Sequence, residues 1–188
     1  MEIISNSPPE NVMAVGKFES MHLGHQALIH KAKAKSIALG LPLVVMSFYP
    51  HPATVLGPSE HRRLVPVDDT LRVLCDECRV DYYLKYPFTK AFSKLSPNEF
   101  CKILFVDLKV EELFVGEDYR FGAGRRGSTR ELVLEAAVYG KKVTVVPFEK
   151  LGGKAISTSR IRELVAEGRY DEAHLLLGYK PSSFDVPF

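Results

Sequence analysis

Short apolar runs recur along the chain, with segments of helical spacing between them. Five runs predict strands, at residues 12–15, 42–48, 80–84, 112–115 and 143–147. The run at 42–48 is continuously apolar, which is typical of a strand covered on both faces. Apolar positions at helical spacing predict helices over residues 27–38, 69–78 and 171–177, and further helices starting near Ser96, Ser128 and the hydroxyls at 157–159.

This alternation of strand and helix predicts parallel strands joined by right-handed crossovers. The expected fold is α/β, a Rossmann-like doubly wound parallel sheet of about five strands. We expect one domain over residues 1–178 and a C-terminal tail at 179–188. Ligands of such sheets bind outside the carboxyl ends of the strands. The loops after the strands at 12–15, 42–48 and 112–115 are therefore expected to line one crevice.

The first of these loops carries the most distinctive chemistry. It contains Gly16, Gly24 and two histidines, His22 and His25, between a strand and a helix. Glycine lets the backbone approach a ligand closely, and a helix N-terminus favours an anion. Positioned imidazoles there could stabilise charge during phosphoryl or nucleotidyl transfer. The stretch is also consistent with two solvated histidines; a zinc pair is less favoured, because no further ligands follow at usable spacing.

A second candidate anion site lies near the C-terminus. Residues 156–162 read Ile-Ser-Thr-Ser-Arg-Ile-Arg, so three hydroxyls and two arginines mark the start of an amphipathic helix. Such a start can bind phosphate through backbone amides and guanidinium groups. An ordinary Ser/Thr cap with exposed arginines is the alternative.

Composition narrows the class of protein. The 188 residues are 46% hydrophobic and 26% charged, as in a folded globular domain, and the net charge of +2 does not favour a general nucleic-acid binder. No apolar run reaches membrane-spanning length, and the N-terminus lacks a signal-peptide pattern. Three cysteines suit a reducing cytoplasm. The lone Cys75–Cys78 pair falls at the end of a predicted helix, and no second pair completes a zinc site.

Four motifs in this order resemble the adenylyltransferase module of bacterial FAD synthetase, over about residues 11–178. The first is matched by Gly16, Phe18, His22, Gly24 and His25. The second, Phe-x-Pro-His-Pro, is matched by Phe48, Pro50, His51 and Pro52. The third is matched by Val115, Gly116, Asp118, Arg120, Phe121 and Gly122. The fourth is the stretch at 156–162.

The resemblance implies that FMN phosphate attacks the α-phosphorus of ATP, with Mg²⁺ on the phosphates, giving FAD and pyrophosphate. It implies catalytic roles for His22, His25 and Arg162. The implied ATP-binding residues are Gly16, Phe18, His22, Gly24, His25, Thr158, Ser159 and Arg162. The implied flavin-binding residues are Phe48, Pro50, His51, Pro52, Asp118 and Arg120. Metal ligands are not implied for particular residues. In this setting Arg125, Arg126 and Arg130 are expected to lie near phosphate or solvent rather than nucleic acid.

The chain departs from the family pattern at a few positions. Glu19-Ser20 replaces Asp-Gly, so a backbone that requires positive φ at Ser20 would be strained. Ser128 replaces an aspartate, and Thr158-Ser159 inverts Ser-Thr. No β-barrel riboflavin kinase domain follows in this sequence, so a separate kinase activity is expected to supply FMN. The open alternatives are a nucleotidyltransferase for another phosphate acceptor and a non-catalytic nucleotide- or flavin-binding module.

Overall fold

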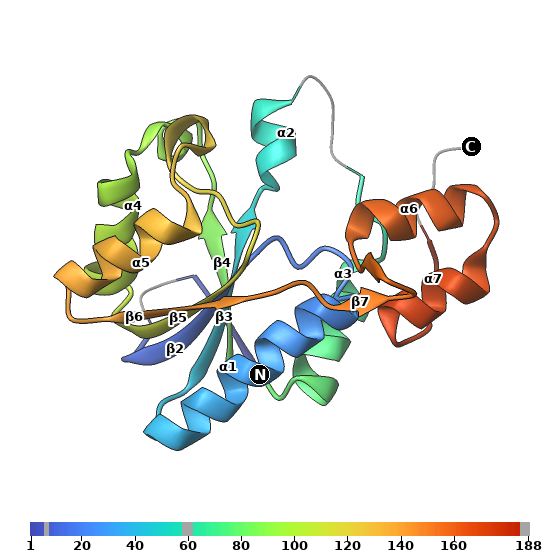
Figure 1. Cartoon of the computed structure of the whole chain (residues 1–188), viewed down its shortest axis with the longest axis horizontal. Helices are drawn as coiled ribbons and strands as arrows, with labels where there is room; N and C mark the ends of the chain where they lie inside the picture. Colours follow the sequence, from blue (N-terminus) through green and yellow to red (C-terminus); the bar gives the residue numbers. More distant parts are fainter. Residues whose placement is uncertain (6–7, 58–61, 185–188) are drawn as a thin grey trace.

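The computed structural model describes residues 1–5, 8–57 and 62–184. Over these residues the centre of the protein is a six-stranded sheet in the order β1-β4-β3-β2-β5-β6, with every neighbouring pair parallel (Figure 1). The strands are β1 (Glu2–Ile4), β2 (Asn11–Val15), β3 (Leu43–Tyr49), β4 (Tyr82–Pro87), β5 (Val110–Gly116) and β6 (Lys142–Val146). The parallel sheet and all five predicted strands are confirmed. The sixth strand, β1, was not predicted, because three half-exposed residues at a sheet edge show no usable period.

Helices cover both faces of the sheet, as the doubly wound prediction requires. One face carries α1 (Leu23–Leu39) and α3 (Val67–Arg72), which continues into a π-helical turn at Val73–Glu77. The other carries α4 (Pro97–Lys102), which continues into a π-helical turn at Ile103–Asp107, and α5 (Thr129–Val138). Strand β2 shows the two-sided burial directly: Val12 packs into the core with α1, whereas Met13 packs into the core with α4 and α5.

Smaller elements stand at the carboxyl ends of the strands. The helix α2 (Pro52–Leu56) rises from the end of β3 (Figure 1), and 3₁₀ turns occur at Phe92–Lys94 and Ala123–Arg125. The sequence predicts a loop directly after the strand at 42–48. Instead Pro52 begins α2, because proline is tolerated in a first helical turn and the His51 side chain caps that turn.

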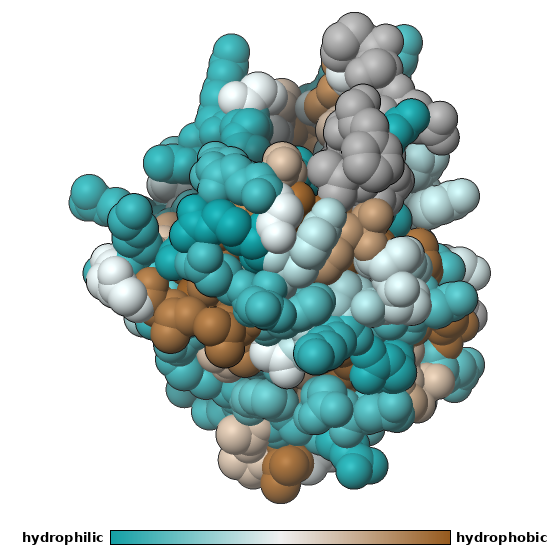
Figure 2. Space-filling view, turned by 90° about the vertical axis from the view of Figure 1, so that its right-hand side faces the viewer, coloured by the Kyte–Doolittle hydropathy of each residue, from teal (hydrophilic) through white to brown (hydrophobic). Residues whose placement is uncertain are grey.

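A helix pair is appended beyond β6. A short hairpin of β7 (Lys150–Leu151) and β8 (Lys154–Ala155) leads into α6 (Thr158–Ala166) and α7 (Tyr170–Leu177). Their apolar faces form a third core cluster, which includes Ile161, Leu164, Ala173 and Leu177. The outward face of this pair, seen in Figure 2, is mainly hydrophilic with small separate hydrophobic patches.

The predicted tail at 179–188 packs against the helix pair as far as it is described. The ring of Phe184 lies 5.9 Å from that of Tyr170 and 5.6 Å from that of His174, measured between centroids. The last four residues of the tail fall outside the described residues. Within the described ranges, none of the helices combines the length and apolar character that a membrane span requires.

Candidate active site

The loop between β2 and α1 ends at His22, which is the N-cap of α1. The His22 Nδ1 atom accepts a hydrogen bond from the backbone N–H of His25 at 3.3 Å. Burial lowers the pKa of His22 to about 4, so this imidazole is neutral at pH 7. A neutral imidazole whose Nδ1 accepts must carry its proton on Nε2. His22 is therefore a hydrogen-bond donor through Nε2, placed at the N-terminus of a 17-residue helix.

His25 lies one turn along α1 and stacks on His22. Their ring centroids are 3.7 Å apart and their planes differ by 13°. Burial and the adjacent His22 hold the pKa of His25 well below its usual range. Among the described residues, the buried Nδ1 of His25 has no hydrogen-bond partner. Such orphaned polar atoms are uncommon in native structures, and a catalytic role is one of the explanations for them.

The two motif glycines make room for these rings. A Cβ at Gly16 would lie 2.9 Å from the ring of Phe18, and one at Gly24 would lie 3.2 Å from the ring of His22. Phe18 is 1% exposed, and its ring meets that of His25 edge-on at 5.3 Å. Phe18 thus supports His25 from within the core, rather than offering a surface to a nucleotide. The glycines permit the packing that sets the imidazoles in place.

The first and fourth motifs meet in space, although they lie more than a hundred residues apart. Arg162 of α6 forms an ion pair with Glu19, with 2.7 Å between Nη2 and Oε1. The hydroxyls of Ser20 and Thr158 are 3.0 Å apart. The carbonyl of Ile156 lies 3.8 Å from the position that a Cβ of Gly24 would take. The start of α6 therefore lies beside the start of α1, as a site built from both motifs requires.

The two arginines of the fourth motif differ in what they contact. The guanidinium of Arg160 donates to three carbonyls of the β7–β8 hairpin, at 3.1–3.3 Å. Arg160 therefore holds the hairpin in place. Of the two arginines expected to bind an anion, this leaves Arg162 as the candidate. Ser157 caps α6, Thr158 faces Ser20, and Ser159 is exposed. Among the described residues, Arg162 donates from Nη2 both to Glu19 Oε1 at 2.7 Å and to the Arg62 carbonyl at 3.3 Å.

The departures from the family pattern have local explanations. Ser20 is fully buried but is not among the residues with positive φ, so its Cβ causes no strain. The positive φ values fall instead at Phe18 and Met21, at 45° and 44°. Ser128 caps α5 and forms a reciprocal capping box with Glu131. We call Glu19, Ser20, His22, His25, Thr158 and Arg162 the phosphate side of the site.

A continuous chain of aromatic rings lies beyond the carboxyl ends of β3 and β4. Phe48 contacts Phe92 at 5.8 Å, Phe92 contacts Phe100 at 6.0 Å, and Phe100 contacts Phe121 at 5.5 Å. Phe88 lies 5.6 Å from Phe48. We call these five phenylalanines the aromatic side. Phe92, in the 3₁₀ turn after β4, and Phe100 of α4 connect Phe48 of the second motif to Phe121 of the third.

The other predicted flavin residues frame this aromatic side. Pro50 is exposed, while His51 and Pro52 are half-buried at the start of α2, where His51 Nδ1 accepts from the Ala53 N–H. Asp118 and Arg120 are exposed on the loop after β5. The phosphate side is linked to β3 by the Ser47 hydroxyl, which donates to the Lys17 carbonyl at 3.0 Å. The predicted crevice residues thus all lie at one edge of the sheet.

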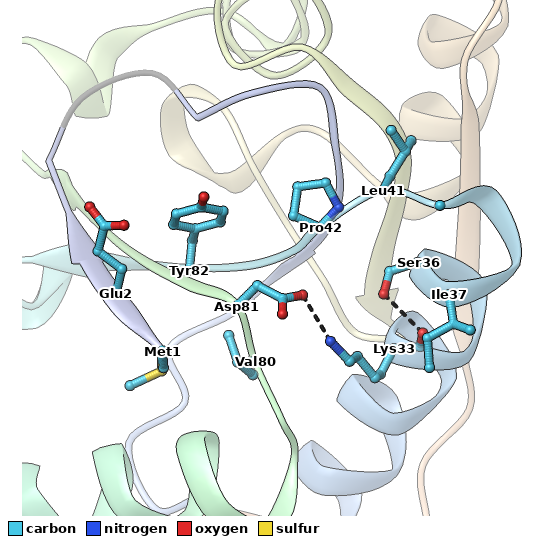
Figure 3. A pocket seen from close by; sticks show the side chains of 11 residues that line it. Met1, Glu2, Lys33, Ser36, Ile37, Leu41, Pro42, Val80, Asp81 and Tyr82 are labelled. Carbon is cyan, nitrogen blue, oxygen red and sulfur yellow. Dashed lines mark hydrogen bonds and ion pairs between the residues drawn. The ribbon is translucent and has the colours of Figure 1, made fainter.

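A cavity of about 720 Å³ opens at the opposite edge of the sheet (Figure 3). It is lined by residues such as Pro42, Asp81 and Tyr82 near the amino ends of the strands, and by Lys33 of α1. Lys33 and Asp81 neutralise each other across it, at 2.8 Å. None of the motif residues lines this cavity, and ligands of open parallel sheets bind at the carboxyl edge. The candidate site is therefore the motif cluster and not this cavity.

The described residues contain no group of three or more His, Cys, Asp or Glu that could hold a metal ion. Mg²⁺ keeps several waters and is commonly held by substrate phosphates and one or two carboxylates. The described side chains therefore fit a metal that is held mainly by a nucleotide.

Several residues of the site escaped the sequence analysis. Phe88 and Phe92 were not singled out, although two aromatics four residues apart directly after a strand are a usable signal. Glu19 and Ser20 were noted only as departures, because their partners lie in the fourth motif. Tyr179, whose hydroxyl donates to the Ser20 carbonyl at 2.7 Å, carried no signal in the sequence.

The chain is similar in sequence to known proteins over most of its length. A profile of the FAD synthetase family matches residues 4–160. A bifunctional riboflavin kinase/FMN adenylyltransferase of Listeria monocytogenes is 37% identical over 171 residues, which cover 89% of this chain and 54% of that protein. An FAD synthetase of the same organism is 30% identical, over 89% of this chain and 68% of that protein.

A solved structure, described as a macrolide-efflux protein from Streptococcus pneumoniae, superposes with a TM-score of 0.83 at 27% identity. The superposition covers 95% of this chain and 61% of the Streptococcus pneumoniae chain. This chain thus spans little more than half the length of the bifunctional relative. The profile match and the identities nevertheless extend over most of its residues, including the β2–α1 loop and the start of α6. The chain belongs to the FAD synthetase family.

Proposed function

We propose that this chain transfers AMP from ATP to FMN, releasing FAD and pyrophosphate. The observation that carries the proposal is the meeting of the first and fourth motifs. It sets Arg162 and the two stacked imidazoles at neighbouring helix N-termini, where a triphosphate is stabilised by amides and donors. The aromatic side, at the same edge of the sheet, supplies the flat apolar contacts that an isoalloxazine ring needs.

The reaction is an in-line displacement. A phosphate oxygen of FMN forms a bond to the α-phosphorus of ATP, and the bond from that phosphorus to the bridging oxygen of the β-phosphate breaks. The electron pair leaves with pyrophosphate. No covalent enzyme intermediate is needed, so the protein acts by placement and by stabilising charge.

Each residue of the phosphate side has a role in this scheme. His22 donates from Nε2, and His25 lies against it, so both imidazoles hold phosphate oxygens around the reacting phosphorus. Arg162 offers Nε and Nη1 to the leaving pyrophosphate while Nη2 stays on Glu19. Thr158 and Ser159 add hydroxyls at the start of α6, and Gly16, Phe18 and Gly24 keep the imidazoles in position.

The flavin is assigned to the aromatic side. Phe48 contributes a ring, and Pro50, His51 and Pro52 shape the entrance at α2. Asp118 and Arg120 face solvent at the other border, where polar groups of the flavin would lie. Mg²⁺ would enter with the phosphates of ATP, which it holds in place of a protein cage. A riboflavin kinase activity would supply the FMN. A cytoplasmic setting is proposed because all three cysteines are free.

The test is an assay with ATP, Mg²⁺ and FMN, with detection of pyrophosphate and mass identification of the product. The expected result is FAD and pyrophosphate in equal amounts. Phosphopantetheine and nicotinamide mononucleotide, offered in parallel, should give no adenylylated product. Adenylylation of either acceptor without FAD formation would reassign the substrate. Calorimetric binding of ATP or FMN without pyrophosphate release would instead indicate a non-catalytic binding module.

A further inference from the structure

Three consecutive backbone carbonyls, directly before His22, each accept a hydrogen bond from a side chain. The donors come from three different parts of the chain: Thr70 Oγ1 to Glu19 at 3.2 Å, Tyr179 Oη to Ser20 at 2.7 Å, and Gln26 Nε2 to Met21 at 2.7 Å. Three successive carbonyls held in this way fix the path of residues 19–21. Of these three donors, Tyr179 is the one that belongs to the tail, and it binds the carbonyl of the central residue, Ser20.

This loop needs outside support. Met21 has a φ of 44°, in the left-handed region that side chains other than glycine seldom adopt. Such a conformation costs about 1 kcal/mol or more and persists only where the surroundings enforce it. The next residue is His22, whose ring caps α1 and stacks on His25. The path of the loop therefore sets the position of both imidazoles.

Tyr179 is itself firmly held. On one side, Gln26 Nε2 donates to the Leu177 carbonyl at 2.8 Å, which ties the end of α7 to α1. On the other, the N–H and hydroxyl of Ser182 both donate to Asp69 Oδ2 at 2.8 Å, which ties the tail to α3. Burial raises the pKa of Tyr179, so its hydroxyl stays protonated and remains a donor at physiological pH.

We propose that Tyr179 is a positioning residue for adenylyl transfer. Its hydroxyl, acting through the Ser20 carbonyl, fixes the loop that places His22 and His25. The described tail at 179–184 is then part of the active-site framework rather than a passive extension of α7. This inference rests on the proposed function for its kinetic consequence, but its structural consequence, the placement of the imidazoles, can be measured separately.

The first experiment compares Tyr179→Phe with Tyr170→Phe in steady-state adenylylation of FMN. Tyr179→Phe removes only the hydroxyl and keeps the ring, which Arg72 overlies at 5.7 Å. Tyr170→Phe is the matched control, because it removes a hydroxyl from α7, where Tyr170 contacts Phe184 of the tail and not the loop. We expect kcat to fall about tenfold in Tyr179→Phe, with KM for ATP changed less than about twofold, since small misplacements of catalytic groups act on the chemical step. The control should match the unmodified chain.

The second experiment follows the imidazole ¹H–¹⁵N signals of His22 and His25 by NMR in the same two variants, without substrate. Displaced signals in Tyr179→Phe and unchanged signals in Tyr170→Phe support the positioning role, even if the chain proves not to act on FMN. A lower melting temperature with unchanged signals and unchanged kcat would show that the hydroxyl only stabilises the fold, and would overturn the proposal. If Tyr179→Phe does not fold, Ser182→Ala weakens the tail anchor and should shift the same signals to a smaller extent.

Discussion

The phosphate side and the aromatic side share one edge of the sheet but are held together by different kinds of interaction. The phosphate side depends on directional contacts, such as the 2.7 Å ion pair of Arg162 with Glu19 and the 3.0 Å contact of Ser20 with Thr158. The aromatic side consists of rings 5.5–6.0 Å apart, whose attraction tolerates changes of angle. The difference shows where this fold fixes geometry tightly and where it only provides a complementary surface. Single substitutions should therefore be severe on the first side and mild on the second.

The largest effect is expected for His25→Ala. Loss of a positioned phosphate donor should lower kcat for FAD formation about a hundredfold or more. FMN binding, measured by calorimetry, should change little, because the aromatic side is intact. His30→Ala is the matched control, since His30 is an exposed histidine on the same helix. Turnover close to normal in His25→Ala would remove the imidazole from the mechanism and the basis for calling this region a phosphate side.

An intermediate effect is expected when the pH is lowered. The pKa of His22 is about 4 in the folded protein, whereas an exposed histidine has a pKa of 6.5. Between these pH values the unfolded chain therefore binds a proton that the folded chain does not. Its contribution to stability is complete above pH 6.5 and is lost as the pH falls toward 4, by at most about 3 kcal/mol. Denaturant unfolding at several pH values should show a smaller loss in His22→Asn than in His30→Asn. Equal losses would show that His22 is not neutral when folded.

The smallest effect is expected for Phe48→Leu on the aromatic side. Leucine keeps most of the apolar volume but loses the ring face, so KM for FMN should rise about fivefold, in keeping with the modest energy of a single aromatic pair. KM for ATP should stay the same. Phe105→Leu is the control, because Phe105 pairs with Tyr139 outside the site and loses a ring of the same kind. A larger change in KM for ATP than for FMN would reverse the assignment of the two sides.

The fold was largely readable from the sequence because each central strand is buried on both faces. Continuous apolar runs such as the one around Val44 and Val45 predict strands of a parallel sheet. The elements that the sequence did not predict are those with a weak local pattern of apolar and polar residues. Strand β1 is too short to show a period, and α2 depends on a histidine cap followed by proline, which by composition resembles a loop.

The sequence predicts residue types for the candidate site but not which residues contact one another. The motifs identified His22, His25 and Arg162, yet nothing in their spacing shows that Arg162 meets Glu19 or that Arg160 is bound to the β7–β8 hairpin. Those partners are set by how α6 docks, which depends on packing around Ile161 and Leu164. The hydroxyl of Tyr179 is the extreme case, because its bond to Ser20 spans 159 positions and involves only a backbone carbonyl of its partner.

The cap at the start of α1 has a consequence for how charge reaches the substrate. The N–H of His25 is already taken up at the helix start, by the His22 carbonyl at 2.8 Å and the His22 imidazole at 3.3 Å. The ring accepts at Nδ1 and donates from Nε2. It therefore presents a hydrogen-bond donor one ring width beyond the N-terminus of the helix. In the proposed reaction, a phosphate held by that outer nitrogen would lie farther from the helix than one held by the backbone amides alone.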